Sequence, residues 1–278
     1  MEPPDLRDVY RGTPLAITKV LGEQMAWADD GTSGLDCLAA VARHLLARLP
    51  AADRGPRPDG CTLVRYFWTD FDGTGPEALR AAKRAAAPDG APFVALAESP
   101  EMREFFWGLE PFHLFGAVRI RVVGGRWKKP PHDVARMAAE SLVSWSDPAN
   151  DLAACVSVMF EPLTIGNVAS QQLPRPASVI RVATARFAAN PRFTVPRQLE
   201  VPRRPGGPDS YSLVAAVKLR EEAGGSDQVV LFDQGQKAIM VPFFAKFYAA
   251  GRWSFQDGGS FMLYFVHLGA PGPVDSNR

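Results

Sequence analysis

The stretch TSGLDCLAAVARHLLARL (residues 32–49) does most to decide the fold. It is a glycine-containing loop that leads into a helix-forming segment. From Cys37 onward the apolar residues recur at the i, i+3, i+4, i+7 spacing of a helix face. This face consists of Leu38, Val41, Ala42, Leu45, Leu46 and Leu49. The spacing predicts an amphipathic helix over 37–49, which Asp36 or Ser33 would cap and Pro50 would stop.

Further helices are expected on both sides of residue 100, and strands later in the chain. The helical segments are 76–87, 99–108 and 132–145. The segments rich in β-branched and aromatic residues are 153–160, 177–187, 211–220, 228–234, 237–243, 251–255 and 261–267. Helices followed by strands indicate an α+β fold with a largely antiparallel sheet. We expect a single domain, with a helical lobe to residue 150, a β lobe over 151–269 and a flexible tail over 270–278.

Composition places the chain among ordinary globular proteins. Its 278 residues are 46% apolar and 22% charged, and 31 basic residues against 30 acidic ones give a formal charge of +1. This balance gives no support for binding nucleic acid or a membrane surface by overall charge. The short basic patch over 119–131 is interpreted as two strands with a solvated turn.

Targeting and metal signals are absent from the sequence. No apolar run is long enough to span a membrane and no secretory signal begins the chain, so we expect an intracellular protein of the cytoplasm or nucleus. The cysteines Cys37, Cys61 and Cys155 lack the paired spacing of thiolate zinc sites. We therefore expect no metal and no cofactor.

Cys37 is the residue with the most chemical interest. A thiol in the first turn of a helix is activated by the partial positive charge and the free N–H groups there, which can also hold an oxyanion. Against this, a cysteine in an Ala- and Leu-rich helix is more often a buried core residue. Asp36 beside the thiol would oppose thiolate formation.

Several segments together resemble the ubiquitin-specific protease family. Residues 34–49 are similar to the family's Cys box, and LPRPASVIRVATARF (173–187) to its "LP.vLii.l.RF" strand. FTVPRQLEV (193–201) and YSLVAAV (211–217) follow in the family's order. WSFQD and FMLYF, within 253–265, resemble its closing "W..f.D" and "Y.L.Y" segments. The resemblance covers roughly residues 30–267 and rests on the ordered set, since no single motif is specific.

The resemblance implies a papain-like fold with a helical thumb, a β palm and reduced fingers. It implies Cys37 as the nucleophile and Asp257 as the acidic residue that orients the catalytic histidine. The histidine itself is missing, because Asp227, or less readily Gln228, stands in its place. Thr32 stands where the family has the asparagine that donates to the oxyanion, and a hydroxyl offers one donor at best.

A carboxylate with an ordinary pKa near 4 cannot replace imidazole, since it would repel a thiolate and return protons poorly. The resemblance therefore implies a pseudo-deubiquitinase, a binding or scaffolding module that recognises ubiquitin, a ubiquitin-like modifier or another protein. The alternative is an active thiol hydrolase that uses Cys37 with a non-standard base. A third interpretation is an unrelated α+β protein with a buried Cys37, and a protease of the OTU type ranks lower.

The four histidines of the chain are the alternatives for a substitute base. His44 lies about 10 Å along the helix axis from Cys37, where we expect it at the edge of the core. His113, His132 and His267 could serve only in a rearranged site.

Overall fold

The computed structural model describes most of the chain between residues 32 and 268. The described residues are 32–48, 60–69, 75–87, 90–122, 124–128, 142–174, 177–201, 208–222, 225–233, 236–238 and 253–268.

A six-stranded sheet forms the centre of the molecule. Its order is β2-β5-β9-β7-β6, and β8 pairs with the other end of β7 on the same side as β6. The strands are β2 (Val143–Trp145), β5 (Val179–Thr184), β6 (Gln198–Val201), β7 (Asp209–Lys218), β8 (Gln228–Leu231) and β9 (Phe261–His267). All pairs are antiparallel except β2 with β5. β7 and β9 are buried along most of their length because both faces of the sheet are covered.

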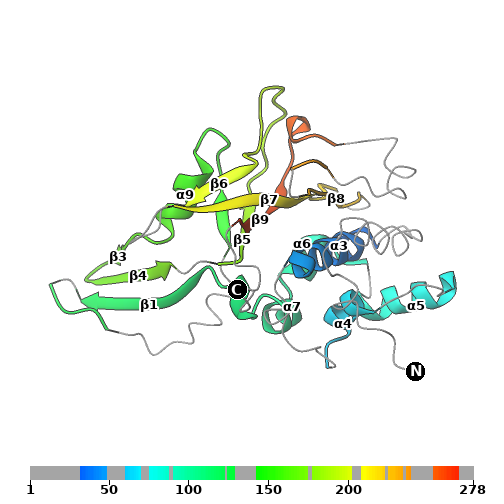
Figure 1. The fold of residues 1–278 in the computed structure, drawn as a ribbon, viewed down its shortest axis with the longest axis horizontal. Coiled ribbons are helices and arrows are strands. Elements are labelled where there is room, and N and C mark those ends of the chain that lie inside the picture. Colours follow the sequence, from blue (N-terminus) through cyan, green and yellow to red (C-terminus); the bar gives the residue numbers. More distant parts are fainter. Residues whose placement is uncertain are drawn as a thin grey trace, which may run out of the picture.

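The helices gather against one part of this sheet (Figure 1). They are α3 (Ser33–Arg48), α4 (Thr62–Trp68), α5 (Pro76–Ala86), α6 (Phe93–Ala97) and α7 (Pro100–Phe105), with a single turn of 3-10 helix, η3 (Glu110–Phe112). α3 contacts β7 and β8 on one side, and α4 and α6 on the others. Two further elements, α9 (Leu152–Val158) and η4 (Phe255–Asp257), lie among the strands in the sequence.

A second sheet of three strands extends away from the helices (Figure 1). Its order is β1 (Phe115–Val122), β4 (Val168–Pro174) and β3 (Leu163–Ile165), and all its pairs are antiparallel. Ile120 of β1 also forms an isolated bridge with Lys128. We call these three strands together with residues 124–128 the arm. The basic patch is thus a strand followed by a turn and a returning bridge, as predicted for it.

The coarse prediction of an α+β fold with a largely antiparallel sheet is confirmed. The segments 177–187, 211–220, 228–234 and 261–267 supply β5, β7, β8 and β9 of one sheet. Helices predicted over 76–87 and 99–108 are present as α5 and α7.

Other predictions for single elements were wrong. The segment 153–160 was predicted to be a strand but lies mostly in α9, because Asp151 caps a helix there by accepting a hydrogen bond from the Ala153 amide. The end of the predicted helix 132–145 is strand β2. The rest of that helix, most of the predicted strand 237–243, Leu49 and the tail 270–278 lie outside the described residues.

Candidate functional site

The amino end of α3 is where the sequence-predicted residues meet. The helix begins at Ser33, and the Asp36 amide donates to the Thr32 carbonyl at 3.0 Å. Cys37 is therefore the fifth residue of the helix, and its expected position in the first turn was wrong. The backbone N–H groups that a helix leaves free belong to the residues before Asp36. Cys37 thus lies about one turn further along the helix than the free N–H groups that would hold an oxyanion.

Gly34 lets the first turn of α3 press against the segment that leads into α6. A Cβ atom built on Gly34 would lie 2.6 Å from the Phe93 nitrogen and 2.8 Å from the Pro92 carbonyl carbon. No side chain fits at such distances, so the two backbones meet directly. This contact closes one side of the α3 amino end.

The Cys37 side chain is fully buried in the main hydrophobic core. Burial raises the pKa of the thiol well above its usual range, and the negative charges of Asp227 and Asp36 raise it further. The group is therefore a protonated thiol at neutral pH, which is the unreactive form. The environment is the reverse of the electropositive, partly exposed setting that activates a cysteine.

Asp227 lies at the amino end of α3, where the resemblance would place the base. Its Oδ2 accepts from the Phe93 amide and its Oδ1 from the Arg220 amide, both at 3.0 Å. Its own amide donates to Ser33 Oγ at 3.1 Å. The side chain is buried, so both carboxylate oxygens are committed to holding two backbone segments together. Gln228, the other candidate for this position, is half-buried and begins β8 opposite Lys218.

A further hydrogen bond joins the same segments. Arg220 Nη2 donates to the Gly90 carbonyl at 3.2 Å. The loop before β8 is thereby tied to α3 through Ser33 and to the segment before α6 through Gly90 and Phe93. We call Ser33, Gly90, Phe93, Arg220 and Asp227 the clamp.

Thr32 and Asp36 belong to a second polar group beside the thiol. Thr32 Oγ1 donates to Asp36 Oδ2 at 3.0 Å, and Lys83 Nζ of α5 lies 2.7 Å from Asp36 Oδ1. Both charged side chains are buried. Burial raises the pKa of Asp36, while the charge of Lys83 acts in the opposite direction. The Thr32 hydroxyl, expected as an oxyanion donor, is thus directed to a carboxylate.

Asp257 is used differently from the role that the resemblance implies. It lies in η4, where its Oδ2 accepts from the Ser254 amide at 2.6 Å and completes a capping box. The side chain is exposed, and the described contacts include none with Cys37 or Asp227. The structure brings together Thr32, Cys37 and Asp227 but leaves Asp257 as a local cap.

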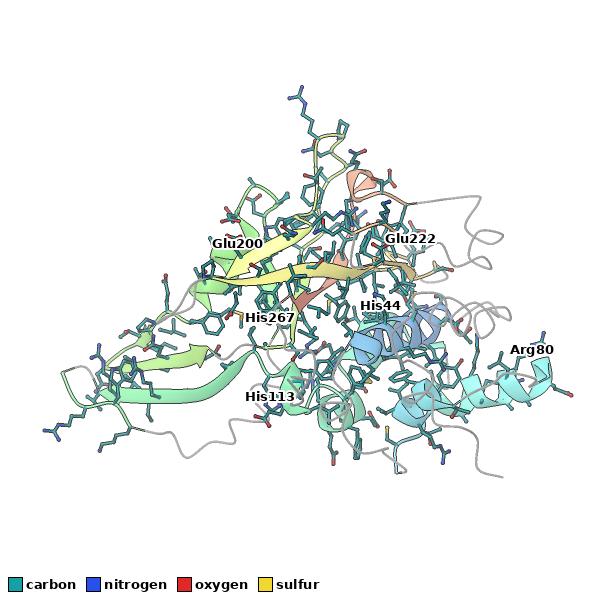
Figure 2. The ribbon with its side chains drawn as sticks, in the orientation of Figure 1. His44, Arg80, His113, Glu200, Glu222 and His267 are labelled. Carbon is teal, nitrogen blue, oxygen red and sulfur yellow. The ribbon has the colours of Figure 1, made fainter. Side chains whose placement is uncertain are left out.

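Each described histidine has a partner other than Cys37, and Figure 2 shows the three in different parts of the molecule. His44 is fully buried, with Nε2 3.0 Å from the Phe232 carbonyl, so its expected position at the core edge was wrong. His113 Nε2 lies 3.0 Å from the Gly108 carbonyl. His267 Nε2 lies 3.3 Å from Asp209 Oδ1, at the end of β9 that is roughly 20 Å from the clamp end. His132 lies outside the described residues.

Two buried cations in contact with α3 or part of it were not indicated by the sequence. Lys83 pairs with Asp36, and Arg43 donates from α3 to the carbonyls of Phe67 and Tyr66 at the carboxyl end of α4. A charged residue on an otherwise apolar helix is usually assigned to the solvent face. The only signal in the sequence was that Asp36, Arg43 and His44 interrupt a segment with few other polar residues.

Within the described ranges, no group of three or more His, Cys, Asp or Glu side chains is arranged to hold a metal ion. In the same ranges no helix has both the length and the apolar character needed to cross a membrane. A scan against protein-family models and a search of curated proteins found no match to this chain.

Proposed function

We propose that this chain is a pseudoenzyme with a fold like that of the ubiquitin-specific proteases, and that it binds protein rather than cleaving it. Its partner is ubiquitin, a ubiquitin-like modifier or another protein. The binding surface lies where the helical part meets the six-stranded sheet, around the partly exposed clamp residues Ser33, Gly90 and Arg220. Its site is the clamp with Cys37 beneath it.

The arrangement of the strands supports this proposal. Each segment that carries the resemblance after residue 177 contributes to the six-stranded sheet, apart from Trp253 to Asp257, which precedes β9. One of those strands, β7, packs on the helix that contains Cys37, and so does its neighbour β8. The position of Asp227 beside Ser33, at the amino end of that helix, is the one that the resemblance implies for the base.

The main support for an inactive site is that Asp227 has a structural role. A general base must accept a proton from the thiol and return it to the leaving group. Asp227 instead accepts two backbone hydrogen bonds, and its charge helps to keep Cys37 protonated. The residues at the positions of nucleophile, base and oxyanion donor are Cys37, Asp227 and Thr32. Each of them makes structural contacts instead.

The test uses ubiquitin that carries a carboxyl-terminal propargyl group, which forms a covalent adduct with an active-site thiolate. We expect no adduct with the unmodified protein, measured by intact mass. An adduct that is lost in Cys37→Ala and kept in Cys155→Ala would show an active thiol hydrolase and contradict the proposal.

Binding is tested separately with unmodified ubiquitin and ubiquitin-like proteins by titration calorimetry. Saturable binding to one of them, weakened when its carboxyl-terminal tail is removed, is the expected result. If none of them binds, the proposal that the chain recognises ubiquitin or a ubiquitin-like modifier is wrong. The partner would then have to be another protein.

A further inference from the structure

One face of the arm carries a group of apolar side chains that is distinct from the clamp. Val168 of β4 lies directly opposite Val122 of β1 and Ile165 of β3. Directly opposed residues of antiparallel strands point to the same face, as do residues two apart along one strand. Ile120 and Leu163 therefore share that face. We call Ile120, Val122, Leu163, Ile165 and Val168 the arm face.

Four of these side chains are unusually exposed, while Ile120 is half-buried. The exposed fractions are 57% for Val122, 42% for Val168, 60% for Leu163 and 73% for Ile165. In the described part of the chain, four of the seven exposed large apolar side chains lie here. Scattered apolar residues are normal on a surface, but a contiguous group on one face indicates a binding site.

Positive charge borders the arm face along β1. Lys128 pairs with Ile120, so it lies on the same face, and Arg126 is two residues earlier. Both are exposed. Trp127, between these two residues, points to the opposite face. Its ring stacks with Arg119 and Arg121 there, and their guanidinium carbons lie 4.5 and 4.6 Å from the ring centroid.

The overall charge of the arm is positive. In its described residues and the approach to β3, four cations are accompanied by one acidic residue, Glu161. A partner that covers the apolar side chains must therefore place acidic groups beside Arg126 and Lys128. This excess of cations also disfavours face-to-face pairing of two copies.

The outer edge of β3 is open. β3 is the last strand of its sheet, so within the described residues its outward N–H and C=O groups have no strand partner. A protein segment can hydrogen-bond to these groups and a lipid acyl chain cannot. The exposed Glu161 near this edge also disfavours an anionic membrane.

The size of the arm face fits a short segment. Three strands spaced about 4.8 Å apart give a width of about 10 Å, close to the diameter of one helix or a pair of extended chains. A stable dimer buries about 800 Å² on each partner, more than a face of five side chains provides. The arm face suits a peptide-sized partner.

We propose that the arm face binds a short acidic protein segment whose apolar side chains cover Val122, Ile165 and Val168 while its carboxylates pair with Arg126 and Lys128. This site does not depend on the function proposed for the clamp.

The experiment uses the full chain and three labelled 14-residue probe peptides, measured by fluorescence anisotropy at two salt concentrations. One peptide is composed of Leu and Glu in an amphipathic order, the second has Lys in place of Glu, and the third has Ser in place of Leu. We expect the Leu/Glu peptide to bind with the highest affinity, by about tenfold, and more weakly at high salt.

Two substitutions test the position of the site. Ile165→Ser and Arg126→Glu should each weaken binding of the Leu/Glu peptide by about tenfold. Leu268→Ser, which changes an exposed apolar residue outside the arm, is the matched control and should leave binding unchanged. Ile165 is exposed, so its substitution should not unfold the protein, which circular dichroism checks.

Several results would overturn the proposal. They are no binding of the Leu/Glu peptide, equal binding of the Lys peptide, or binding that Ile165→Ser leaves intact. Vesicles of phosphatidylserine and phosphatidylcholine that bind the protein while the peptides do not would assign the face to a membrane. Self-association in sedimentation equilibrium that Ile165→Ser abolishes would assign it to a second copy.

Discussion

At the scale of single residues, Asp227 and Cys37 define each other's roles. A carboxylate that accepts two backbone hydrogen bonds is a structural group, and its negative charge near a buried sulfur disfavours the thiolate. Under the proposed function, giving this site thiol protease activity would require more than supplying imidazole. It would also require a way to open the clamp and free the Thr32 hydroxyl from Asp36.

Asp227→Asn should destabilise the protein. The amide offers one oxygen where the carboxylate offered two, so one of the amides of Phe93 and Arg220 loses its acceptor. We expect a loss of about 1–3 kcal/mol in the free energy of unfolding, measured by urea denaturation. Asp147→Asn is the control, because among the described residues the exposed Asp147 side chain accepts a hydrogen bond from the Ala149 amide alone. Equal effects of the two substitutions would contradict the structural role of Asp227.

Asp227→His should not create an active enzyme. Imidazole has one acceptor nitrogen at most and cannot hold both backbone amides, and Thr32 still lacks the amide of the family's oxyanion donor. We expect no turnover of a fluorogenic ubiquitin substrate. Turnover at the level of an active ubiquitin-specific protease from this single change would contradict the proposed non-catalytic site.

At the scale of elements, α3 organises the helical part of the molecule. Every residue from Gly34 to Leu46 is buried, including the polar Asp36, Arg43 and His44. Asp36 pairs with Lys83, Arg43 donates to carbonyls at the end of α4, and His44 Nε2 lies 3.0 Å from the Phe232 carbonyl. A helix surrounded on every side depends on its neighbours for its polar contacts as well as for its apolar ones.

Leu45→Ala tests this placement of α3. Leu45 is fully buried in the core, so its truncation should cost about 2–5 kcal/mol of stability. Val94→Ala in α6, at an exposed position, should change the stability by less than about 0.5 kcal/mol. Urea denaturation measures both, and an unchanged midpoint for Leu45→Ala would contradict the position of the helix.

The sequence predicts an element well when the residues that determine it are close together in the chain. The β-branched and aromatic run Phe261–His267 is β9 with the predicted bounds, and Pro76 marks the start of α5 as expected. The first turn of α3 was missed because Gly34 disfavours a helix locally, and only its contact with the Phe93 backbone explains it. Likewise, the burial of Lys83 depends on Asp36, 47 positions away, which no local pattern reveals.

The candidate site was predictable only in part. The proximity of Cys37 and Asp227 was anticipated by the resemblance, because it depends on the order of the segments. The use of Asp227 as a clamp was not, since it requires the loop before α6 to pass over the amino end of α3. Asp257 is used for a local contact instead, because its carboxylate accepts from the Ser254 amide, which the resemblance did not indicate.

At the scale of the whole molecule, two clusters of buried residues lie on the two faces of the six-stranded sheet. One of these clusters contains side chains that ionise at alkaline pH. Cys37, Tyr66 and Tyr264 are all buried, and burial raises the pKa of each group. Above the ordinary thiol and phenol pKa values the unfolded chain loses these protons and the folded protein keeps them. Stability must then fall as pH rises, at up to about 1.4 kcal/mol per pH unit for each group.

Tyr264→Phe should reduce this alkaline loss. The Tyr264 hydroxyl is fully buried and has no hydrogen-bond partner among the described residues, so its removal should be neutral or slightly stabilising at pH 7. Between pH 8 and 11 the variant should lose about 1.4 kcal/mol less stability than the unmodified protein. Urea denaturation at the two pH values measures the difference, and parallel losses in the two proteins would contradict the burial of this hydroxyl.

The most direct measurement is the rate at which iodoacetamide labels Cys37 at pH 7.5, followed by peptide mass spectrometry. Cys155 is half-buried and serves as the standard within the same molecule. We predict that Cys37 reacts much more slowly than Cys155 and that its labelling rises only as urea unfolds the protein. Rapid labelling of Cys37 in the folded protein would reveal an accessible thiolate and contradict a closed, non-catalytic site.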